Sequence, residues 1–311
     1  MTLDIADCDF DISTPQMAQG EMYPKISIKV DKIQVALYFE YSLDEYLRFP
    51  AYKFDVLHGN FGKKGVVHKA HPSSAFTAMS QPLENGGCLF IRYGYSHKRF
   101  KAFLEFNPNH IDMFELRGHL TLLLHHGYDS LLERGIVTYC EFAADVKDAK
   151  LQDYLYLDAK LRCGSSLRRF IGSDYVGSER SNRSFLAYDK RKELLDHKKD
   201  NLTYDLLRIE ARLRGAKYFP LKDISAVESP FDSFHVIDRA VFESSDLPAL
   251  SALREQLPCF DGCLQLAYAS LSPKLKQQAR CSLKSMQPNW WKPKDIWKTL
   301  PNSKFAKEAS I

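Results

Sequence analysis

The sequence predicts an α+β protein in which helices pack on one face of a central, mostly antiparallel sheet. A smaller helical region is expected to follow at the C-terminal end. Three observations predict this class. In the first two-thirds of the chain β-rich and helical segments alternate, and several of the β-rich segments alternate apolar with charged side chains. After Pro220 the pattern changes to helices and loops with no convincing strand.

The N-terminal half is predicted to be rich in strands. Residues 25–40 are β-rich, with a break in the alternation near Asp31 and Lys32. Short strands at 53–58 and 66–70, separated by a glycine-rich turn, and a hairpin at 88–96 and 99–107 are expected next. A helical stretch over 111–134, interrupted near Gly118 and Gly127, completes this half.

The second half is predicted to contain the strands that matter for function. The expected order is a strand at 136–146, a helix at 151–162, a β-rich stretch at 167–188, a charged helix at 189–199 and a strand at 204–214. We therefore divide the chain into a first domain, residues 1–220, with a β-rich half 1–107 and a second half 108–220. The helical basic C-terminal region is residues 221–311.

The composition favours a globular protein of the cytoplasm. Of the 311 residues 45% are hydrophobic and 26% charged, which allows a sizeable core. No apolar run approaches the length of a membrane span, and the acidic, polar residues 1–15 do not resemble a secretory signal. The seven cysteines form no metal-finger or disulfide pattern, Cys259 and Cys263 having no second pair at ligand spacing, so we expect reduced thiols.

The net charge of +4 is mild, but positive charge is concentrated near the C-terminus. Residues 272–311 carry nine Lys or Arg against two acids and are interleaved with Trp290, Trp291 and Trp297. Such a tail suits a polyanion, because phosphates supply affinity and aromatic faces can stack on bases. A solvated basic tail is the alternative. The cations we expect to contact DNA are Lys274, Lys276, Arg280, Lys284, Lys292 and Lys294.

Three predicted strands each present an apolar face and a face that carries carboxylates, because successive strand residues point to opposite sides. A cation bound by oxygen ligands alone would be Mg²⁺ or Mn²⁺ rather than zinc. Ordinary surface ion pairs with the neighbouring arginines are the alternative, but three such strands together favour a site. The acids are Glu105 in the first strand, Glu141 and Asp145 in the second, and Glu210 in the third, where Arg208, Arg212 and Arg214 share its face.

A tyrosine lies between the second and third of these strands. Residues 177–183 are polar and basic and include a glycine, so they suit a loop that approaches phosphate, with Arg180 and Arg183 as contacts. A short β-like run then ends in Tyr188, and Lys190 follows two residues later. A phenol has a pKa near ~10, so a cation close by is needed to make the phenolate available for attack on a phosphodiester. The alternative is that Tyr188 merely packs at the end of a strand.

The order of these motifs resembles that of rolling-circle replication initiators of the replication initiation factor (Rep_trans) superfamily, which includes filamentous-phage gene II proteins. The likeness covers about residues 95–224. The matching segments are Leu104-Glu-Phe-Asn-Pro108, Tyr139-Cys-Glu-Phe-Ala-Ala-Asp145, Gly177-Ser-Glu-Arg-Ser181, Tyr188-Asp-Lys190 and Arg208-Ile-Glu-Ala-Arg-Leu213.

The resemblance implies a relaxase-like nicking domain in residues 1–220 that cuts one DNA strand and rejoins it through a 5′-phosphotyrosine. Tyr188 would be the nucleophile, with Tyr175 competing for that role. The resemblance further implies a replication origin as the DNA partner, host helicase and polymerase as protein partners, and the possibility of a homodimer. Metal ligands would be Glu141, Asp145, Glu210 and Glu105, holding Mg²⁺ or Mn²⁺, and Lys190 and Arg212 would be electrostatic helpers.

The chain departs from the family where Tyr139, Cys140 and Glu141 replace the usual Arg-Ile-Asp. It also lacks the His-hydrophobic-His triplet of the better-known HUH nicking enzymes; the nearest histidines are His68, His71, His125 and His126. Two other functions stay open. A conjugative or mobilisation relaxase would use the same chemistry on a transfer origin, and a non-catalytic origin-binding regulator would need neither the metal nor Tyr188.

Overall fold

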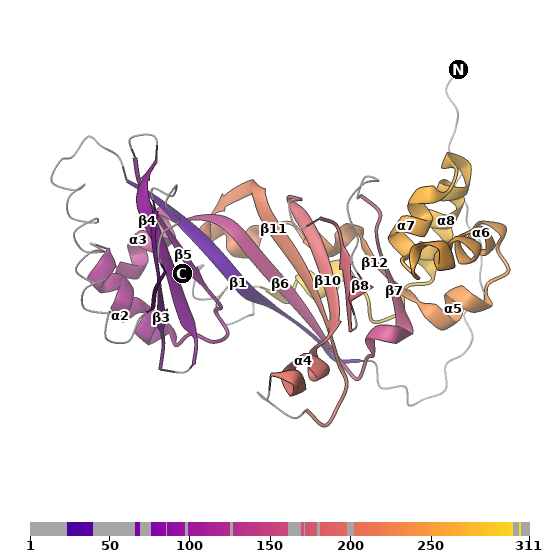
Figure 1. Ribbon diagram of the computed structural model, residues 1–311, viewed down its shortest axis with the longest axis horizontal. Helices are drawn as coiled ribbons and strands as arrows, with labels where there is room; N and C mark the ends of the chain where they lie inside the picture. The colour runs from indigo at the N-terminus through magenta and orange to yellow at the C-terminus, as the bar shows by residue number, and fades with distance from the viewer. Residues whose placement is uncertain are drawn as a thin grey trace, which may run out of the picture.

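The protein is an α+β protein built on one large antiparallel sheet, as the sequence predicts (Figure 1). The computed structural model describes residues 24–39, 66–68, 76–84, 86–96, 99–124, 127–160, 169–170, 172–178, 181–197, 202–300 and 305. The strand predicted at 53–58 and the histidines His71, His125 and His126 lie outside these residues. No helix in the described ranges is both long and apolar enough to cross a membrane.

The large sheet has the strand order β2-β3-β4-β5-β1-β6-β11-β10-β9-β8, and every pairing in it is antiparallel. Its long central strands, β1, β6 and β11, connect the two halves of the molecule (Figure 1). The strands are β1 (Ile26–Phe39), β2 (Val66–His68), β3 (Phe76–Pro82), β4 (Cys88–Ser96), β5 (Arg99–Phe106), β6 (Ile136–Lys147), β8 (Arg169–Phe170), β9 (Ser173–Val176), β10 (Arg183–Asp189) and β11 (Leu206–Pro220).

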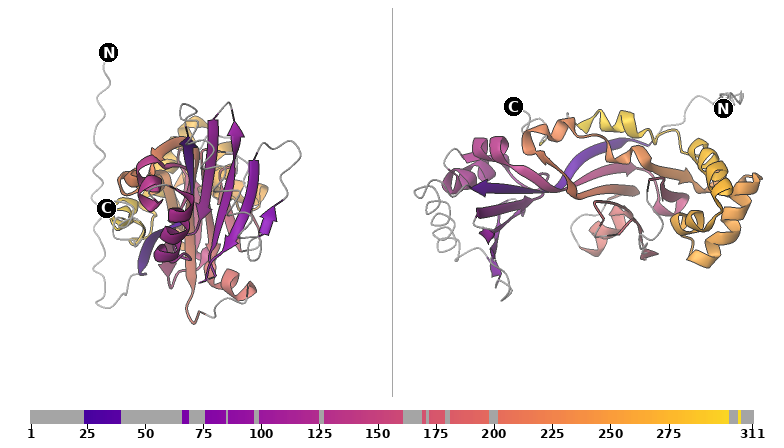
Figure 2. Two further views of the ribbon diagram at one scale, coloured as in Figure 1. Left: turned by 90° about the vertical axis from the view of Figure 1, so that its left-hand side faces the viewer. Right: turned by 90° about the horizontal axis from the view of Figure 1, so that it is seen from above.

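The helices lie between the strands of the large sheet in the sequence and, after residue 238, form most of the C-terminal region. Seen from above, the chain around residue 290 lies on one side of the central strands and α4 on the other (Figure 2). The helices are α2 (Met113–Leu123), α3 (Gly127–Arg134), α4 (Lys190–Asp196), α5 (Arg239–Ser244), α6 (Pro248–Gln256), α7 (Leu264–Ser270), α8 (Pro273–Ser285) and α9 (Pro293–Trp297). Shorter 3-10 turns are η1 (Leu151–Asp153), η2 (Leu221–Ala226), η3 (Pro230–Ser233) and η4 (Leu257–Phe260).

Two sequence predictions about the second half are wrong. The helix expected at 151–162 is instead the turn η1 followed by a strand, β7 (Tyr154–Asp158), which is almost wholly buried. The strand β12 (Phe234–Asp238) pairs with it in a separate two-stranded sheet, although no strand was expected after Pro220. Neither strand pairs with a neighbour in sequence, so local patterns carry little sign of them.

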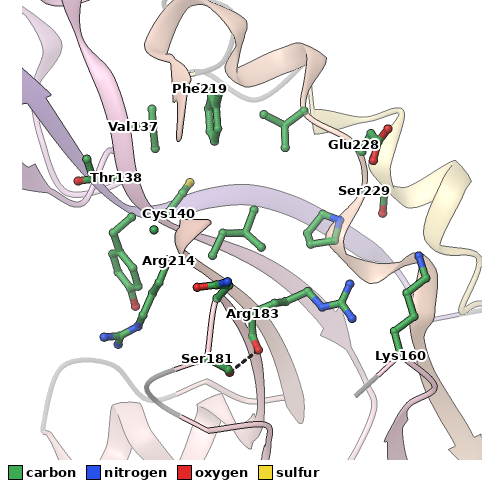
Figure 3. A pocket seen from close by; sticks show the side chains of 16 residues that line it. Val137, Thr138, Cys140, Lys160, Ser181, Arg183, Arg214, Phe219, Glu228 and Ser229 are labelled. Carbon is green, nitrogen blue, oxygen red and sulfur yellow. Dashed lines mark hydrogen bonds between the residues drawn. The ribbon is translucent and has the colours of Figure 1, made fainter. Parts of the chain in front are cut away.

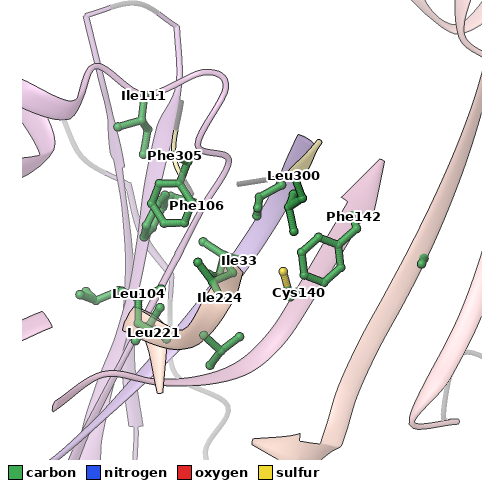
Figure 4. Close-up of a cluster of buried hydrophobic side chains, with 14 of the residues drawn as sticks. Ile33, Leu104, Phe106, Ile111, Cys140, Phe142, Leu221, Ile224, Leu300 and Phe305 are labelled. Carbon is green, nitrogen blue, oxygen red and sulfur yellow. The ribbon is translucent and has the colours of Figure 1, made fainter. Parts of the chain in front are cut away.

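One face of each central strand is apolar because it packs against the hydrophobic core. Ile33, Leu104, Cys140 and Phe142 point away from the polar face and are fully buried, and η2 supplies Ile224 to the same cluster (Figure 4). A second, smaller cluster joins β7 to helices α6, α7 and α8. Chain segments on both sides of residue 220 therefore contribute to both clusters, and the division of domains at 220 stays a prediction.

Two tryptophans of the basic tail, Trp291 and Trp297, pack against the core rather than being free to stack on bases, which corrects the expectation from sequence for these two. Trp291 is 3% exposed and its indole N–H donates to the Phe234 carbonyl at 3.0 Å. Trp297 packs edge-on against Phe142 with ring centroids 4.8 Å apart and donates to the Val227 carbonyl at 2.7 Å. The C-terminal segment is thereby anchored on the apolar face of the sheet.

Trp291→Ala is expected to destabilise the fold by about 3–5 kcal/mol, the usual cost of removing a buried aromatic side chain. Chemical denaturation of the variant and the parent protein measures this difference. If Trp291 were a platform for bases, the variant would keep its stability and lose affinity for single-stranded DNA instead.

Candidate functional site

The polar face of the sheet brings together three neighbouring strands, β6, β11 and β10. In the register of β11 with β6, Arg208 lies opposite Asp145 and Arg212 opposite Glu141. In the register of β10 with β11, Tyr188 lies opposite Arg208. Residues directly opposite each other in a sheet share a face, so all five side chains belong to one surface. The alternation that the sequence shows is therefore preserved in the fold.

A trio of carboxylates forms the centre of this surface. Asp31, Glu141 and Glu210 each offer an oxygen, and the three oxygens lie within 4.8 Å of one another. Glu210 is buried at 3% exposure, while the other two are half-buried. Among the residues that the structure describes, no other group of three or more His, Cys, Asp or Glu side chains lies close enough together to hold a metal ion.

Asp31 reaches the trio because β1 is irregular there. The pairing of β1 with β6 shifts register between Val30 and Lys32, so Asp31 is the extra residue of a β-bulge. Such a bulge re-aims side chains and is frequent beside active sites. Asp31 was not among the candidate ligands predicted from the sequence, although the broken alternation near Asp31 and Lys32 was the signal that could have found it.

Tyr188 adjoins the trio. Its hydroxyl donates a hydrogen bond to Oε1 of Glu210 at 2.8 Å, and its side chain is partly exposed. The ammonium group of Lys190, at the start of α4, lies 5.7 Å from the centre of the Tyr188 ring and is ion-paired with Glu193. Tyr188, the predicted nucleophile, thus lies between one predicted ligand, Glu210, and one predicted helper, Lys190.

The electrostatics of this contact favour protonated groups in the absence of a bound cation. Burial, followed by the negative charge of Glu210, raises the pKa of the Tyr188 phenol well above its usual value. Burial and the charge of Glu141 likewise raise the pKa of the Glu210 carboxyl. Arg208 acts in the opposite direction on Tyr188. A further positive charge at the trio would therefore be needed to make the phenolate accessible.

Arg212 connects two members of the trio. Its Nη2 lies 2.8 Å from Oε2 of Glu210 and its Nε lies 3.3 Å from Oε1 of Glu141. Tyr139, on the other side, donates a hydrogen bond to the same oxygen of Glu141. Arg212 therefore holds the two glutamates at a fixed separation and offsets part of their charge.

Asp145, predicted as a ligand, is not part of the trio. Arg208 grips it through Nε–Oδ1 and Nη2–Oδ2 contacts of 2.5 and 2.9 Å, and Lys29 adds a contact of 2.9 Å. Burial alone would raise the pKa of Asp145, but the hydrogen bonds and charge of Arg208, with Lys29, lower it below its usual range. Asp145 serves as the counter-ion of a buried arginine.

Asp145→Asn is expected to destabilise the protein by about 3 kcal/mol at neutral pH, because it leaves the buried Arg208 with only a long contact of 3.5 Å to the carboxylate of Asp31. A carboxyl whose pKa is lowered on folding stabilises above its unfolded pKa of about 3.9 and loses that contribution as the pH falls. The difference between variant and parent should therefore shrink below about pH 4. Urea unfolding at several pH values measures it. Asp295→Asn, at an exposed pair with Lys298, should leave the unfolding midpoint unchanged.

Glu105 and Tyr175 lie on the same face but outside the trio. The carboxylate of Glu105 contacts Nζ of Lys32 at 2.5 Å and accepts a hydrogen bond from Gln34 at 3.0 Å. Tyr175, on β9, lies opposite Leu186, which is two residues before Tyr188 on β10. Tyr175 therefore lies one strand further from β11 and Glu210 than Tyr188 does.

The predicted DNA-contacting arginines differ in their surroundings. Arg183 is ion-paired with the fully buried Asp158 at 2.7 Å. Arg208 is buried and ion-paired with Asp145. Both guanidinium groups therefore serve the fold. Arg214 is exposed and lies over the ring of Tyr139 at 4.9 Å. Arg180 lies outside the described residues.

The predicted cations of the C-terminal region lie at the surface. Five of the six are exposed and Lys276 is partly exposed, which leaves them accessible to a polyanion. Four belong to α8 and two flank the start of α9. The residues are Lys274, Lys276, Arg280, Lys284, Lys292 and Lys294.

The chain is similar in structure to a rolling circle replication initiator protein from Geobacillus stearothermophilus. The TM-score is 0.36 at 15% sequence identity, and the match covers 62% of this chain and 76% of that chain. No protein-family model matches the chain, and no curated protein sequence matches it. The function proposed below is therefore argued from the site itself.

Proposed function

We propose that this protein initiates rolling-circle replication of a phage or plasmid by nicking one DNA strand at the origin and later rejoining it. One observation carries the proposal: the hydroxyl of a partly exposed tyrosine, Tyr188, contacts a carboxylate that belongs to a three-carboxylate cluster. A nucleophile beside a candidate cation site is a pairing that suits cleavage of a phosphodiester.

The trio fits a divalent cation with oxygen ligands. Ligand oxygens on opposite sides of one such cation lie about 4–5 Å apart, twice the usual bond length, and the trio oxygens lie within 4.8 Å of one another. Asp31, Glu141 and Glu210 would hold Mg²⁺ or Mn²⁺. The bound cation would supply positive charge for the phenolate and for the scissile phosphate.

Each protein group then has a defined part in the reaction. The phenolate oxygen of Tyr188 attacks phosphorus, and the bond from phosphorus to the 3′ oxygen breaks. The products are a free 3′-OH, which accepts the proton that the phenol gives up, and a 5′-phosphotyrosine that conserves the bond for rejoining. Lys190, held over the Tyr188 ring, offsets negative charge at the attacking group, and Arg212 fixes the two glutamates.

The cations of the C-terminal region are proposed to bind origin DNA, since charge on exposed lysines suits phosphate contacts that set position without reading sequence. In this proposal residues 1–220 perform the cleavage and residues 221–311 add affinity for the duplex. Host helicase and polymerase would act on the nicked product, and a homodimer would let two copies serve one origin.

Incubation of the protein with supercoiled origin plasmid and Mn²⁺ or Mg²⁺ tests the proposal. We expect nicked circles and a protein–DNA adduct that resists denaturant and disappears after nuclease digestion. Chelation with EDTA should abolish both products, and plasmid lacking the origin should stay supercoiled. A protein that binds origin DNA tightly but never nicks it under these conditions would be a non-catalytic regulator instead.

A further inference from the structure

A cavity of about 550 Å³ lies where the starts of β7 and α5 meet the end of α8. Figure 1 places these elements at the end of the molecule opposite α2. The walls of the cavity include Tyr154, Asp238, Val241 and Trp290, and we call it the Trp290 cavity. Trp290, the third tryptophan of the basic tail, is partly exposed. None of the described residues that line this cavity belongs to the candidate site.

Two aromatic rings form one corner of the Trp290 cavity. The rings of Tyr154 and Trp290 are nearly perpendicular, with an interplanar angle of 89° and centroids 5.2 Å apart. A corner between two perpendicular rings is bounded by a face of each ring. A cation over such a face, within about 6 Å of the ring centre, is attracted by the π electrons. The corner therefore offers a cation two favourable contacts at once.

A carboxylate lies in the same cavity as the aromatic pair. Asp238 caps the start of α5, where its Oδ1 accepts a hydrogen bond from the Val241 N–H at 3.1 Å. An ionised carboxylate can accept about four hydrogen bonds, so this contact leaves capacity for a ligand. Burial raises the pKa of the Tyr154 phenol, and the charges of Asp153 and Asp238 raise it further. The negative field of the two acids therefore reaches the aromatic corner.

The charge of its lining distinguishes the Trp290 cavity from a second one. The second cavity, of about 540 Å³, lies between β6 and β11 and is lined by three cations and one acid, Lys160, Arg183, Arg214 and Glu228 (Figure 3). Among the described residues that line the Trp290 cavity, Asp238 is charged and none is a lysine or arginine. A DNA phosphate would meet the Asp238 carboxylate there, which disfavours nucleic acid as the occupant. A cationic side chain would meet the carboxylate and two ring faces instead.

Apolar side chains are exposed on α5 and directly after it, which favours a protein partner over a free cation. Val241, a wall of the cavity, is 47% exposed, and Leu247 is 48% exposed. They are two of the four large hydrophobic side chains that are exposed in the described part of the chain. Apolar residues exposed beside a pocket favour a protein contact. Residues 1–23, which precede the cavity wall Pro24, contain five acids and no lysine or arginine, so they do not supply the cation.

We infer that the Trp290 cavity is a docking site for an arginine side chain of a protein partner, whose neighbouring apolar residues contact Val241. Arginine fits better than lysine, because its planar guanidinium both stacks on aromatic faces and pairs with a carboxylate through two parallel N–H groups. The cavity is lined by neither the carboxylate trio nor Tyr188. The inference therefore does not depend on the proposed nicking reaction.

The test compares arginine with citrulline, which has nearly the same shape and no charge. A dye-labelled peptide amide with arginine between leucines, and a matched peptide with citrulline, are titrated into the full-length protein, and fluorescence anisotropy reports binding. We expect the arginine peptide to bind at least about tenfold tighter, as is usual for a hydrogen bond to a charged group. Trp290→Ala should weaken its binding. Asp238→Asn should remove the preference over citrulline, although asparagine still caps α5.

Phe114→Ala is the matched control, because it removes an exposed aromatic side chain from α2 at the other end of the molecule. It should leave the affinity for the arginine peptide unchanged, and circular dichroism confirms that each variant is folded. Equal affinity of the parent protein for the arginine and citrulline peptides would overturn the inference. So would a preference for arginine that survives in both Trp290→Ala and Asp238→Asn.

Two further measurements test the alternative occupants. Binding of a thymidine pentanucleotide that Trp290→Ala abolishes and Asp238→Asn strengthens would assign the cavity to a base. A dimer in sedimentation equilibrium that dissociates in Asp238→Asn would make the occupant a second copy of this chain. Either result would overturn the assignment to a separate protein partner.

Discussion

If the protein nicks DNA as proposed, Tyr188→Phe is expected to lower the rate of strand cleavage by at least about 10³-fold, since removal of the proposed nucleophile leaves no group to form the covalent intermediate. The variant removes one oxygen and keeps the ring, so the contact with Lys190 should survive. The measurement is conversion of supercoiled origin plasmid to nicked circles, with the covalent adduct followed on denaturing gels. Affinity for origin DNA should stay within a few-fold of the parent.

Tyr175→Phe is the matched control, because Tyr175 lies on the next strand and shares the same face. It should retain cleavage and adduct. A reversed pattern, with cleavage lost in Tyr175→Phe and kept in Tyr188→Phe, would move the nucleophile to β9 and separate it from the contact with Glu210. Loss in both variants together with loss of DNA binding would point to damage of the surface rather than of the chemistry.

The faces of the central strands could be read from the sequence because side-chain alternation is a local property. Glu141 and Glu210 were found in this way, and each retains on the folded sheet the face that its neighbours predicted. Their approach to each other could also be anticipated, since strands that alternate in the same manner tend to share one sheet. The local pattern was therefore sufficient to predict which face of the sheet Glu141 and Glu210 occupy.

The pairing between strands could not be read from the sequence, and there the predictions were wrong or incomplete. Asp145 has the same alternation as Glu141, but register places Arg208 directly opposite it, and the arginine takes both of its oxygens. Asp31 lies at a break in the alternation, but only the pairing of β1 with β6 shows that it is the extra residue of a bulge. Which acids come together at the candidate cation site therefore depends on strand partners that are distant in sequence.

The basic C-terminal tail shows a different limit of composition. Lysines and tryptophans interleave there as in a surface that binds single strands, yet Trp291 is buried and Trp297 packs on Phe142. Amphipathic spacing alone does not distinguish an aromatic ring that meets a base from one that meets a sheet. The cations face outward because charge is costly to bury, and that part of the pattern is robust.

Asp31→Asn is expected to weaken Mn²⁺ binding at least about 100-fold, since loss of groups that merely orient metal ligands already costs 10–100-fold. Asp31 is the most informative member of the trio to change. Glu210 also holds the Tyr188 hydroxyl and Arg212, whereas the contacts of Asp31 with Arg208 are long, at 3.5 Å. Isothermal titration with Mn²⁺ measures the affinity, and nicking should fall in parallel at low metal concentration.

Glu105→Gln is the matched control for this experiment. It removes a carboxylate from the same face, but one held by Lys32 and Gln34 outside the trio, so Mn²⁺ affinity should stay within a few-fold of the parent. Thermal unfolding gives an independent measure, because a ligand that binds only the folded state at 100 times its Kd stabilises it by about 2.7 kcal/mol. That increment should vanish in Asp31→Asn and persist in Glu105→Gln. If the increment instead vanishes only in Glu105→Gln, the cation binds near β5, and Tyr188 is too far from it to be activated.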